Sequence, residues 1–208
     1  MTRAGVVKAA ALGALVVAAV VGAIASRQPG RSEEARPFPP ASNTPPAVST
    51  GAEARTLGGA RTAALRYLAL AEAVVRMDEA EAVAAQREAA TAAAADALAS
   101  ELSDKLARLR NAYSNGAVAY RLGPLAARAS MLSPDRARVE IWYVGVVAPE
   151  ASSTYEEWRM ARYDLAWERG AWRVAGESSG PGPRPGPESS SEVLGRTLAG
   201  FSSVLTPA

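Results

Sequence analysis

The side chains best suited to acid–base chemistry in this chain are three carboxylates, Asp78, Glu140 and Asp164. A carboxylate that is buried in a cleft has a raised pKa and can act as a general base. Such a base must be buried. Whether one of these three residues can act as a base therefore depends on where its helix or strand places the side chain.

Each carboxylate also has a structural interpretation, which we favour. Asp78 stands where a helix is expected to begin and is a good N-cap. Glu140 is expected to share a strand face with Arg138 as its ionic partner, and Asp164 to lie on the side of Arg162. None of the three is therefore predicted to be catalytic.

The composition removes other common chemistries. The 208 residues include no histidine and no cysteine, so the usual neutral-pH base, thiolate nucleophiles and the commonest metal ligands are absent from the sequence. No glycine-rich phosphate loop and no nucleophile elbow is visible. We expect a protein that is not an enzyme and that has no catalytic, cofactor-binding or metal-binding residues.

Aromatic and basic residues concentrate in the second half of the chain. Trp167 and Trp172 are predicted to be core residues, and Trp142 and Trp158 either core residues or part of a groove for a partner. The arginines there could bind nucleic acid or anionic lipid, but interspersed acids favour a solvated sheet face, and no nucleic acid is expected. These arginines are Arg121, Arg128, Arg136, Arg138, Arg159, Arg162, Arg169 and Arg173.

The region 60–111 has the periodicity of helices. One apolar stripe consists of Ala64, Leu68, Ala71 and Val75, and a later one of Leu98, Leu102, Leu106 and Leu109. A second helix is expected over 79–91 and a third over 92–113, unless the two form one long helix. Their alanines suit either close helix approach in self-association, giving a homo-oligomer, or simply high helix propensity, which we favour.

After Gly116 the period changes to two, which predicts strands. A strand from Val118 is expected to be interrupted at Gly123-Pro124, and the turn at Glu168-Arg169-Gly170 to join the last two strands. The expected strands cover 118–131, 138–147, 155–167 and 172–175. Helices followed by an antiparallel meander indicate an α+β domain, with helices packed on one face of a curved sheet.

The N-terminus carries an uncharged run from Ala9 to Ser26, behind Arg3 and Lys8. Its length fits a transmembrane helix, and its small-residue end at Ala25 also fits a cleaved signal peptide. We favour the anchor. Positive charge before the run predicts a single-pass protein of the cell membrane, with its C-terminal domain extracytoplasmic.

Proline-rich segments separate these parts of the chain. Leu194, Leu198, Phe201 and Leu205 would give the C-terminal segment an amphipathic helix, although it could equally be a disordered end. The expected organisation is a cytoplasmic end with anchor or signal peptide (1–26), a linker (27–59), the α+β domain (60–178), and a Pro/Gly linker with the short helix (179–208).

The segment from Trp158 to Val174 ends in a long strand, a glycine turn and a Trp-Arg-Val strand. This order resembles nuclear-transport-factor-2-like (cystatin-like cone) domains. With the anchor and linker, the chain is similar to the VirB/TcpC-type subunits of conjugation machinery and to the Mce-associated membrane proteins of actinobacteria. The resemblance implies a helix-filled, strongly bent sheet.

The resemblance also implies a function. The expectation is a membrane-anchored, non-catalytic structural or assembly subunit of an envelope-spanning complex with protein partners, such as a conjugative, type IV secretion-like apparatus. One alternative is a secreted or anchored cone-fold ligand-binding protein or enzyme. Another is an Mce-associated accessory protein.

Overall fold

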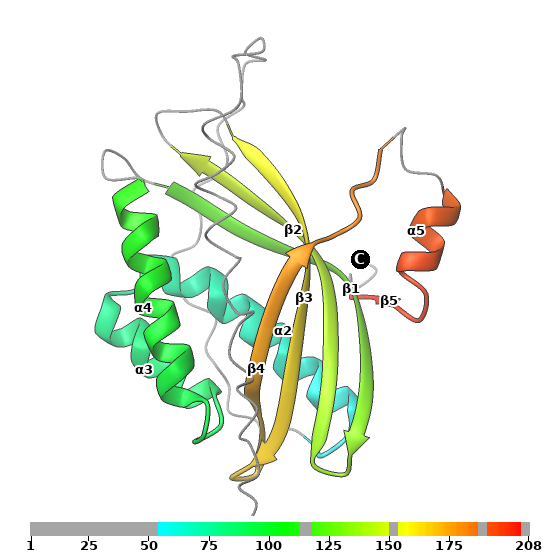
Figure 1. The fold of residues 1–208 in the computed structure, drawn as a ribbon, viewed down its shortest axis with the longest axis horizontal. Helices are drawn as coiled ribbons and strands as arrows, with labels where there is room; N and C mark the ends of the chain where they lie inside the picture. The colour runs from blue at the N-terminus through cyan, green and yellow to red at the C-terminus, as the bar shows by residue number, and fades with distance from the viewer. Residues whose placement is uncertain (1–53, 113–117, 150–153, 187–190, 205–208) are drawn as a thin grey trace, which may run out of the picture.

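The computed structural model describes residues 54–112, 118–149, 154–186 and 191–204. The expected anchor of residues 1–26 lies outside this part, and within the described ranges no helix is long and apolar enough to cross a membrane. The fold is α+β, with helices packed against a five-stranded sheet of order β4-β3-β2-β1-β5, in which every strand pair is antiparallel (Figure 1). The predicted order of helices followed by an antiparallel sheet is confirmed.

The helical half consists of α2 (Leu57–Ala73), the 3-10 turn η1 (Val74–Arg76), α3 (Glu79–Ala89) and α4 (Ala95–Ala112). The side chain of Thr56 caps α2 by accepting a hydrogen bond from the backbone N–H of Gly59. Between α3 and α4 the chain becomes extended at Ala90, and Thr91 donates its N–H to the carbonyl of Val174 at 2.9 Å. This contact with the sheet separates two helices, so the single long helix considered above does not form.

The sheet is built from β1 (Val118–Ser133), β2 (Arg136–Pro149), β3 (Tyr155–Glu168) and β4 (Ala171–Pro181). The break expected at Gly123-Pro124 does not occur, because β1 absorbs it as a bulge between Pro124 and Ala126 and continues. At the far edge β4 extends to Pro181, three residues beyond the domain end expected at 178, and stays paired with β3 as far as Arg159.

The predicted turn between β3 and β4 is a two-residue hairpin. Arg169 and Gly170 have φ values of 54° and 76°, the left-handed values that a type I′ turn requires at both central positions. Glycine adopts this conformation without strain, whereas Arg169 does so at some cost. The turn aligns Trp167 with Trp172 on the two strands, with ring centroids 5.5 Å apart.

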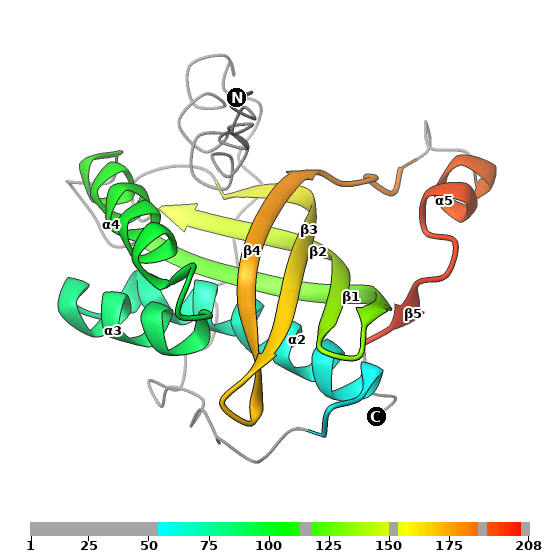
Figure 2. The same ribbon diagram turned by 60° about the horizontal axis from the view of Figure 1, so that its bottom comes forward.

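The two faces of the sheet have different surroundings. The strands bend so that the sheet encloses α2, α3 and α4 on one side, here called the inner face, and α2 runs across the strands there (Figures 1 and 2). The core on this face includes Val139, Ile141, Tyr143, Ala161, Tyr163, Leu165, Trp172 and Val174. Trp172 is buried and Trp167 packs against the core, which confirms the predicted role of both.

The opposite face of the sheet, here called the outer face, is contacted by residues 182–183, which follow β4. The indole N–H of Trp142 donates to the carbonyl of Pro183 at 3.0 Å, and its ring lies 5.6 Å from that of Trp158. The N–H of Gly182 donates to the Trp158 carbonyl at 2.8 Å. Both tryptophans are half-buried there, so this face covers them with the protein's own backbone.

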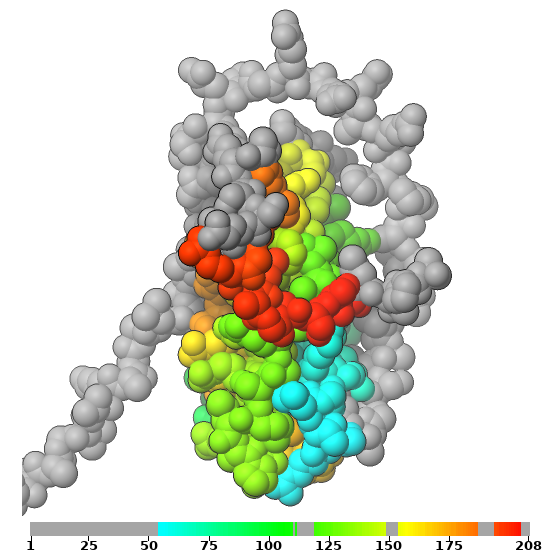
Figure 3. Space-filling view, turned by 90° about the vertical axis from the view of Figure 1, so that its right-hand side faces the viewer, coloured from blue at the N-terminus to red at the C-terminus, as the bar shows by residue number. Residues whose placement is uncertain are grey.

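The C-terminal segment forms α5 (Ser191–Thr197) and β5 (Ser202–Ser203), which pairs with β1 at Ala126 and Ala127. β5 lies beside β1, while α5 stands farther out, next to the same edge of the sheet (Figures 1, 2 and 3). Arg61 on α2 holds β5 through the Ser202 hydroxyl and the Ser203 carbonyl, each at 2.8 Å. The expected amphipathic helix is therefore reduced to residues 191–197, and the chain after it turns into β5, which is docked on β1.

Candidate functional site

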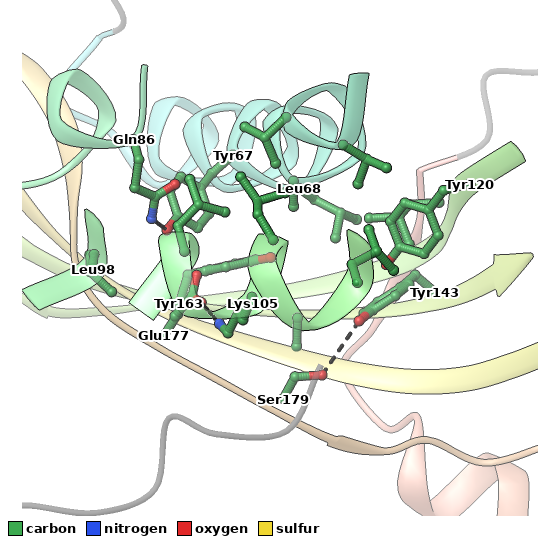
Figure 4. A pocket seen from close by; sticks show the side chains of 18 of the residues that line it. Tyr67, Leu68, Gln86, Leu98, Lys105, Tyr120, Tyr143, Tyr163, Glu177 and Ser179 are labelled. Carbon is green, nitrogen blue, oxygen red and sulfur yellow. Dashed lines mark hydrogen bonds and ion pairs between the residues drawn. The ribbon is translucent and has the colours of Figure 1, made fainter. Parts of the chain in front are cut away.

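A cavity of about 100 Å³ lies between the inner face of the sheet and the helices (Figure 4). Its apolar walls come from both predicted stripes, since α2 contributes Leu68 and Ala71 and α4 contributes all four of its stripe leucines. The lining residues are Tyr67, Leu68, Ala71, Val74, Val75, Gln86, Leu98, Leu102, Lys105, Leu106, Leu109, Tyr120, Leu122, Tyr143, Val147, Ala161, Tyr163, Glu177, Ser178 and Ser179.

A charged cluster lines the cavity between α4 and β4. The Lys105 ammonium lies 2.9 Å from a carboxylate oxygen of Glu177 and 2.9 Å from one of Glu101, one turn earlier on α4. The Lys105 and Glu177 side chains are only 12% and 18% exposed. Burial by itself lowers the pKa of Lys105, but the two carboxylates outweigh it and raise this pKa overall, so the ammonium stays charged.

Tyr67 connects this cluster to α3. Its hydroxyl accepts a hydrogen bond from the Gln86 side-chain amide, and both residues are buried. Burial and the nearby Glu177 carboxylate raise the pKa of Tyr67 far above its ordinary value. The ring of Tyr67 meets that of Tyr163 edge to face, with centroids 5.1 Å apart. This contact fixes the orientation of both rings at the cavity wall.

A second polar group lies farther along β2, β3 and β4. The Tyr143 hydroxyl is 3.4 Å from the Ser179 hydroxyl, which is also 3.4 Å from a guanidinium nitrogen of Arg159. Arg159 is 5% exposed and lies on the inner face, so its predicted place on a solvated sheet face was wrong. Burial raises the pKa of Tyr143, partly offset by Ser179 and Arg159.

The three carboxylates singled out in the sequence do not line this cavity. Asp78 caps α3 by accepting the N–H of Glu81 at 2.8 Å, as predicted. Glu140 lies 2.6 Å from Arg128, which stands opposite it on β1.

The ionic partner predicted for Glu140 was wrong. Arg138 instead lies 2.7 Å from Asp164, directly opposite on β3. The physical reason is that facing residues on adjacent strands are closer than residues two apart on one strand. Asp164 does share the outer face with Arg162, as predicted, since Tyr163 and Leu165 are buried on the other face. Both carboxylates therefore belong to outer-face ion pairs.

Sequence reasoning missed the polar residues of the cavity. Glu177 lies just after the last strand expected, and Ser179 in the expected linker, so neither was considered. Lys105 was overlooked although it lies between Leu102 and Leu106 on the apolar stripe of α4. A single lysine among stripe leucines was the available signal, because a buried cation requires acidic partners nearby.

Within the described ranges no group of acidic side chains is arranged to hold a metal ion. Comparison of the chain with protein-family models, with curated proteins and with solved structures finds no match. The function of the site must therefore be inferred from its geometry. It is an apolar cavity bordered by the Lys105–Glu101–Glu177 ion pairs and by several hydroxyl groups.

Proposed function

We propose that this chain is a membrane-anchored, extracytoplasmic binding protein whose nuclear-transport-factor-2-like cone domain receives a small molecule in the cavity between helices and sheet. The observation that carries the proposal is the cavity itself. Most of its wall is aliphatic, and a few polar groups converge on it from α3, α4 and β4. Ligand sites commonly combine an apolar wall with a small number of fixed polar groups.

The size of the cavity supports a ligand of a few heavy atoms. Its volume of about 100 Å³ is several times that needed for one water molecule. Apolar cavities of a comparable size bind small hydrocarbons such as benzene. The proposed ligand is therefore a small organic molecule.

The proposal is one of binding without catalysis. A general base or amine nucleophile at neutral pH needs a group that releases its proton readily. Lys105 and the tyrosines Tyr67, Tyr120, Tyr143 and Tyr163 all have raised pKa values and hold their protons. These groups are suited to donating hydrogen bonds to a bound molecule.

A cavity-filling substitution tests this function. Ala71 lines the cavity from α2, while Ala69 is exposed on the same helix. We expect the wild-type chain to bind benzene, detected through methyl NMR shifts of the lining leucines, Ala71→Phe to abolish this binding, and Ala69→Phe to retain it. Absence of benzene binding by the wild-type chain, or unchanged binding by Ala71→Phe, would contradict the proposal.

Anchoring is tested separately by cell fractionation and intact mass. A full-length product in the membrane fraction, whose domain is degraded by protease added outside, is expected from the uncharged run that ends at Ser26. A soluble product that begins at Ser26 would replace the anchor with a cleaved signal peptide. The ligand-binding proposal would then apply to a secreted protein.

A second candidate is the assembly subunit of an envelope complex, as the resemblance to conjugation subunits implies. One observation favours it. Leu57, Met131 and Leu132 are 40%, 40% and 52% exposed, and Arg55 ties their segments together by binding Asp135 and the Pro134 carbonyl. Exposed apolar side chains gathered at one end of a domain are typical of protein contacts.

This candidate is tested by replacing the most exposed of these side chains. We expect Leu132→Glu to shift the chain from a large membrane complex to a smaller species on native gels, while Ala97→Glu, at an exposed position of α4, leaves the complex intact. Migration as a single small species by the wild-type chain would exclude an assembly role.

A further inference from the structure

The Tyr163 hydroxyl is unusual among the polar groups of the cavity. The residue is 4% exposed and lines the cavity, yet its hydroxyl makes no hydrogen bond to any residue in the described part of the chain. Figure 4 shows it beside Lys105 and Glu177, with its ring directed along the cavity. The hydroxyl oxygen is not among the described side-chain atoms that are both fully buried and without a partner, so it opens onto the cavity and can donate its proton to a molecule there.

Tyr120, on β1, repeats this arrangement at the other end of the cavity. It lines the cavity, is half-buried, and likewise makes no hydrogen bond within the described ranges. Tyr67 and Tyr143, by contrast, are engaged with Gln86 and Ser179. Two O–H donors therefore remain available to a molecule inside the cavity.

The charged groups argue against an ionic ligand. A ligand carboxylate would have to compete with Glu101 and Glu177, each 2.9 Å from Lys105, for the same ammonium. A ligand ammonium would have to displace Lys105, which already lies 2.9 Å from each of these two carboxylates. Since desolvating a charge is costly without a dedicated partner, an uncharged molecule fits this cluster best.

We propose that the ligand is a small, uncharged, largely apolar molecule that carries a hydrogen-bond acceptor such as a carbonyl oxygen, and that the Tyr163 hydroxyl donates to this acceptor. Tyr120 is the second donor, for a ligand with an acceptor at its other end. This inference rests on the proposed ligand-binding function and adds the chemical class of the ligand.

The test compares molecules of one shape that differ in a single group. The full-length chain is reconstituted in lipid nanodiscs and titrated with cyclohexanone or methylenecyclohexane, with empty nanodiscs as the partition control. The readout is the methyl NMR shift of the lining leucines. We expect cyclohexanone to bind about fivefold more tightly, the value of one hydrogen bond. Tyr163→Phe should remove this preference without weakening methylenecyclohexane, while Tyr155→Phe, outside the cavity, should keep it.

Each other result has a distinct meaning. Equal binding of the two molecules by the wild-type chain, or a preference that survives Tyr163→Phe, would overturn this inference and leave the binding function standing. Binding of neither molecule, with no benzene binding, would overturn the function itself. Tighter binding of cyclohexanecarboxylate, which Arg159 would favour, or of cyclohexylammonium would overturn the uncharged class. Thermal melting of each variant confirms that it is folded.

Discussion

The Lys105 ammonium on α4 lies 2.9 Å from a carboxylate oxygen of Glu177 on β4, so this ion pair joins a helix to an edge strand across the cavity. Both side chains are largely buried, and Glu101 shares the same cation. The pair therefore holds one wall of the cavity in position as well as supplying its charge.

Replacing Lys105 by methionine keeps the length of the side chain but removes the cation. Glu101 and Glu177 would then be left facing each other, and we expect the free energy of unfolding to fall by about 3 kcal/mol. The measurement is urea unfolding of the full chain. Arg87→Ala, which breaks the exposed Arg87–Asp96 pair, should cost about 0.5 kcal/mol or less. Equal losses of unfolding free energy in the two variants would show that the buried ion pairs of Lys105 stabilise the fold no more than an exposed pair does.

The cavity tyrosines predict loss of stability at alkaline pH. Burial raises the pKa of Tyr163 well above the ordinary value of 10.0. A group with a raised folded-state pKa contributes stability that is fully present below its unfolded pKa and is lost as the pH rises toward the folded pKa. We expect the free energy of unfolding to decrease above about pH 10, and less steeply in Tyr163→Phe. Equal slopes would contradict the burial of this hydroxyl.

Arg128 is predicted to hold the C-terminal segment. Besides binding Glu140, it donates to the Ala199 carbonyl at 3.0 Å, and its guanidinium lies 4.9 Å from the centre of the Phe201 ring. We expect Arg128→Ala to increase amide hydrogen exchange in α5 and β5, because these contacts are lost together. Arg138→Ala, which removes a similar cross-strand ion pair without touching this segment, is the control. Unchanged exchange in Arg128→Ala would refute this role.

Trp142 is predicted to fix the chain after β4. Trp142→Phe keeps an aromatic ring but removes the N–H that binds the Pro183 carbonyl. We expect about 1 kcal/mol less stability and faster amide hydrogen exchange at Gly182, whose N–H binds the Trp158 carbonyl in the same segment, followed by mass spectrometry. Exchange at the wild-type rate would show that the hydrogen bond does not restrain this segment.

Local patterns predicted most of the fold. The stripe leucines, the Asp78 cap and the turn at Arg169 and Gly170 each depend on residues close in sequence, and each was confirmed. Along β2, Val139 lies on the inner face and Trp142 on the outer, as the alternation of side chains in a strand requires. Periodicity and capping are local physical effects, which is why sequence alone reveals them.

The candidate site depends on pairings that are distant in sequence. Lys105 and Glu177 are 72 residues apart, and the register that places Glu177 opposite Tyr163 follows from the β3–β4 hairpin and its bulge. The glycines and prolines after Ser179 are typical of a linker, so the sequence did not reveal that β4 continues to Pro181. Side-chain pairing across a sheet requires the register, which composition does not provide.

The pairing of β5 with β1 has a kinetic consequence. Ser202 donates its hydroxyl to the carbonyl of Ala127, a residue 75 positions earlier in the chain. Contacts of such long range form late, because a large loop must close before they contribute any stability. Within the described ranges β5 pairs with β1 only at Ala126 and Ala127, so most of that edge has no strand beside it in the folded chain either. Charged side chains along an edge strand, here Arg121 and Arg128, hinder pairing with the edge of another molecule.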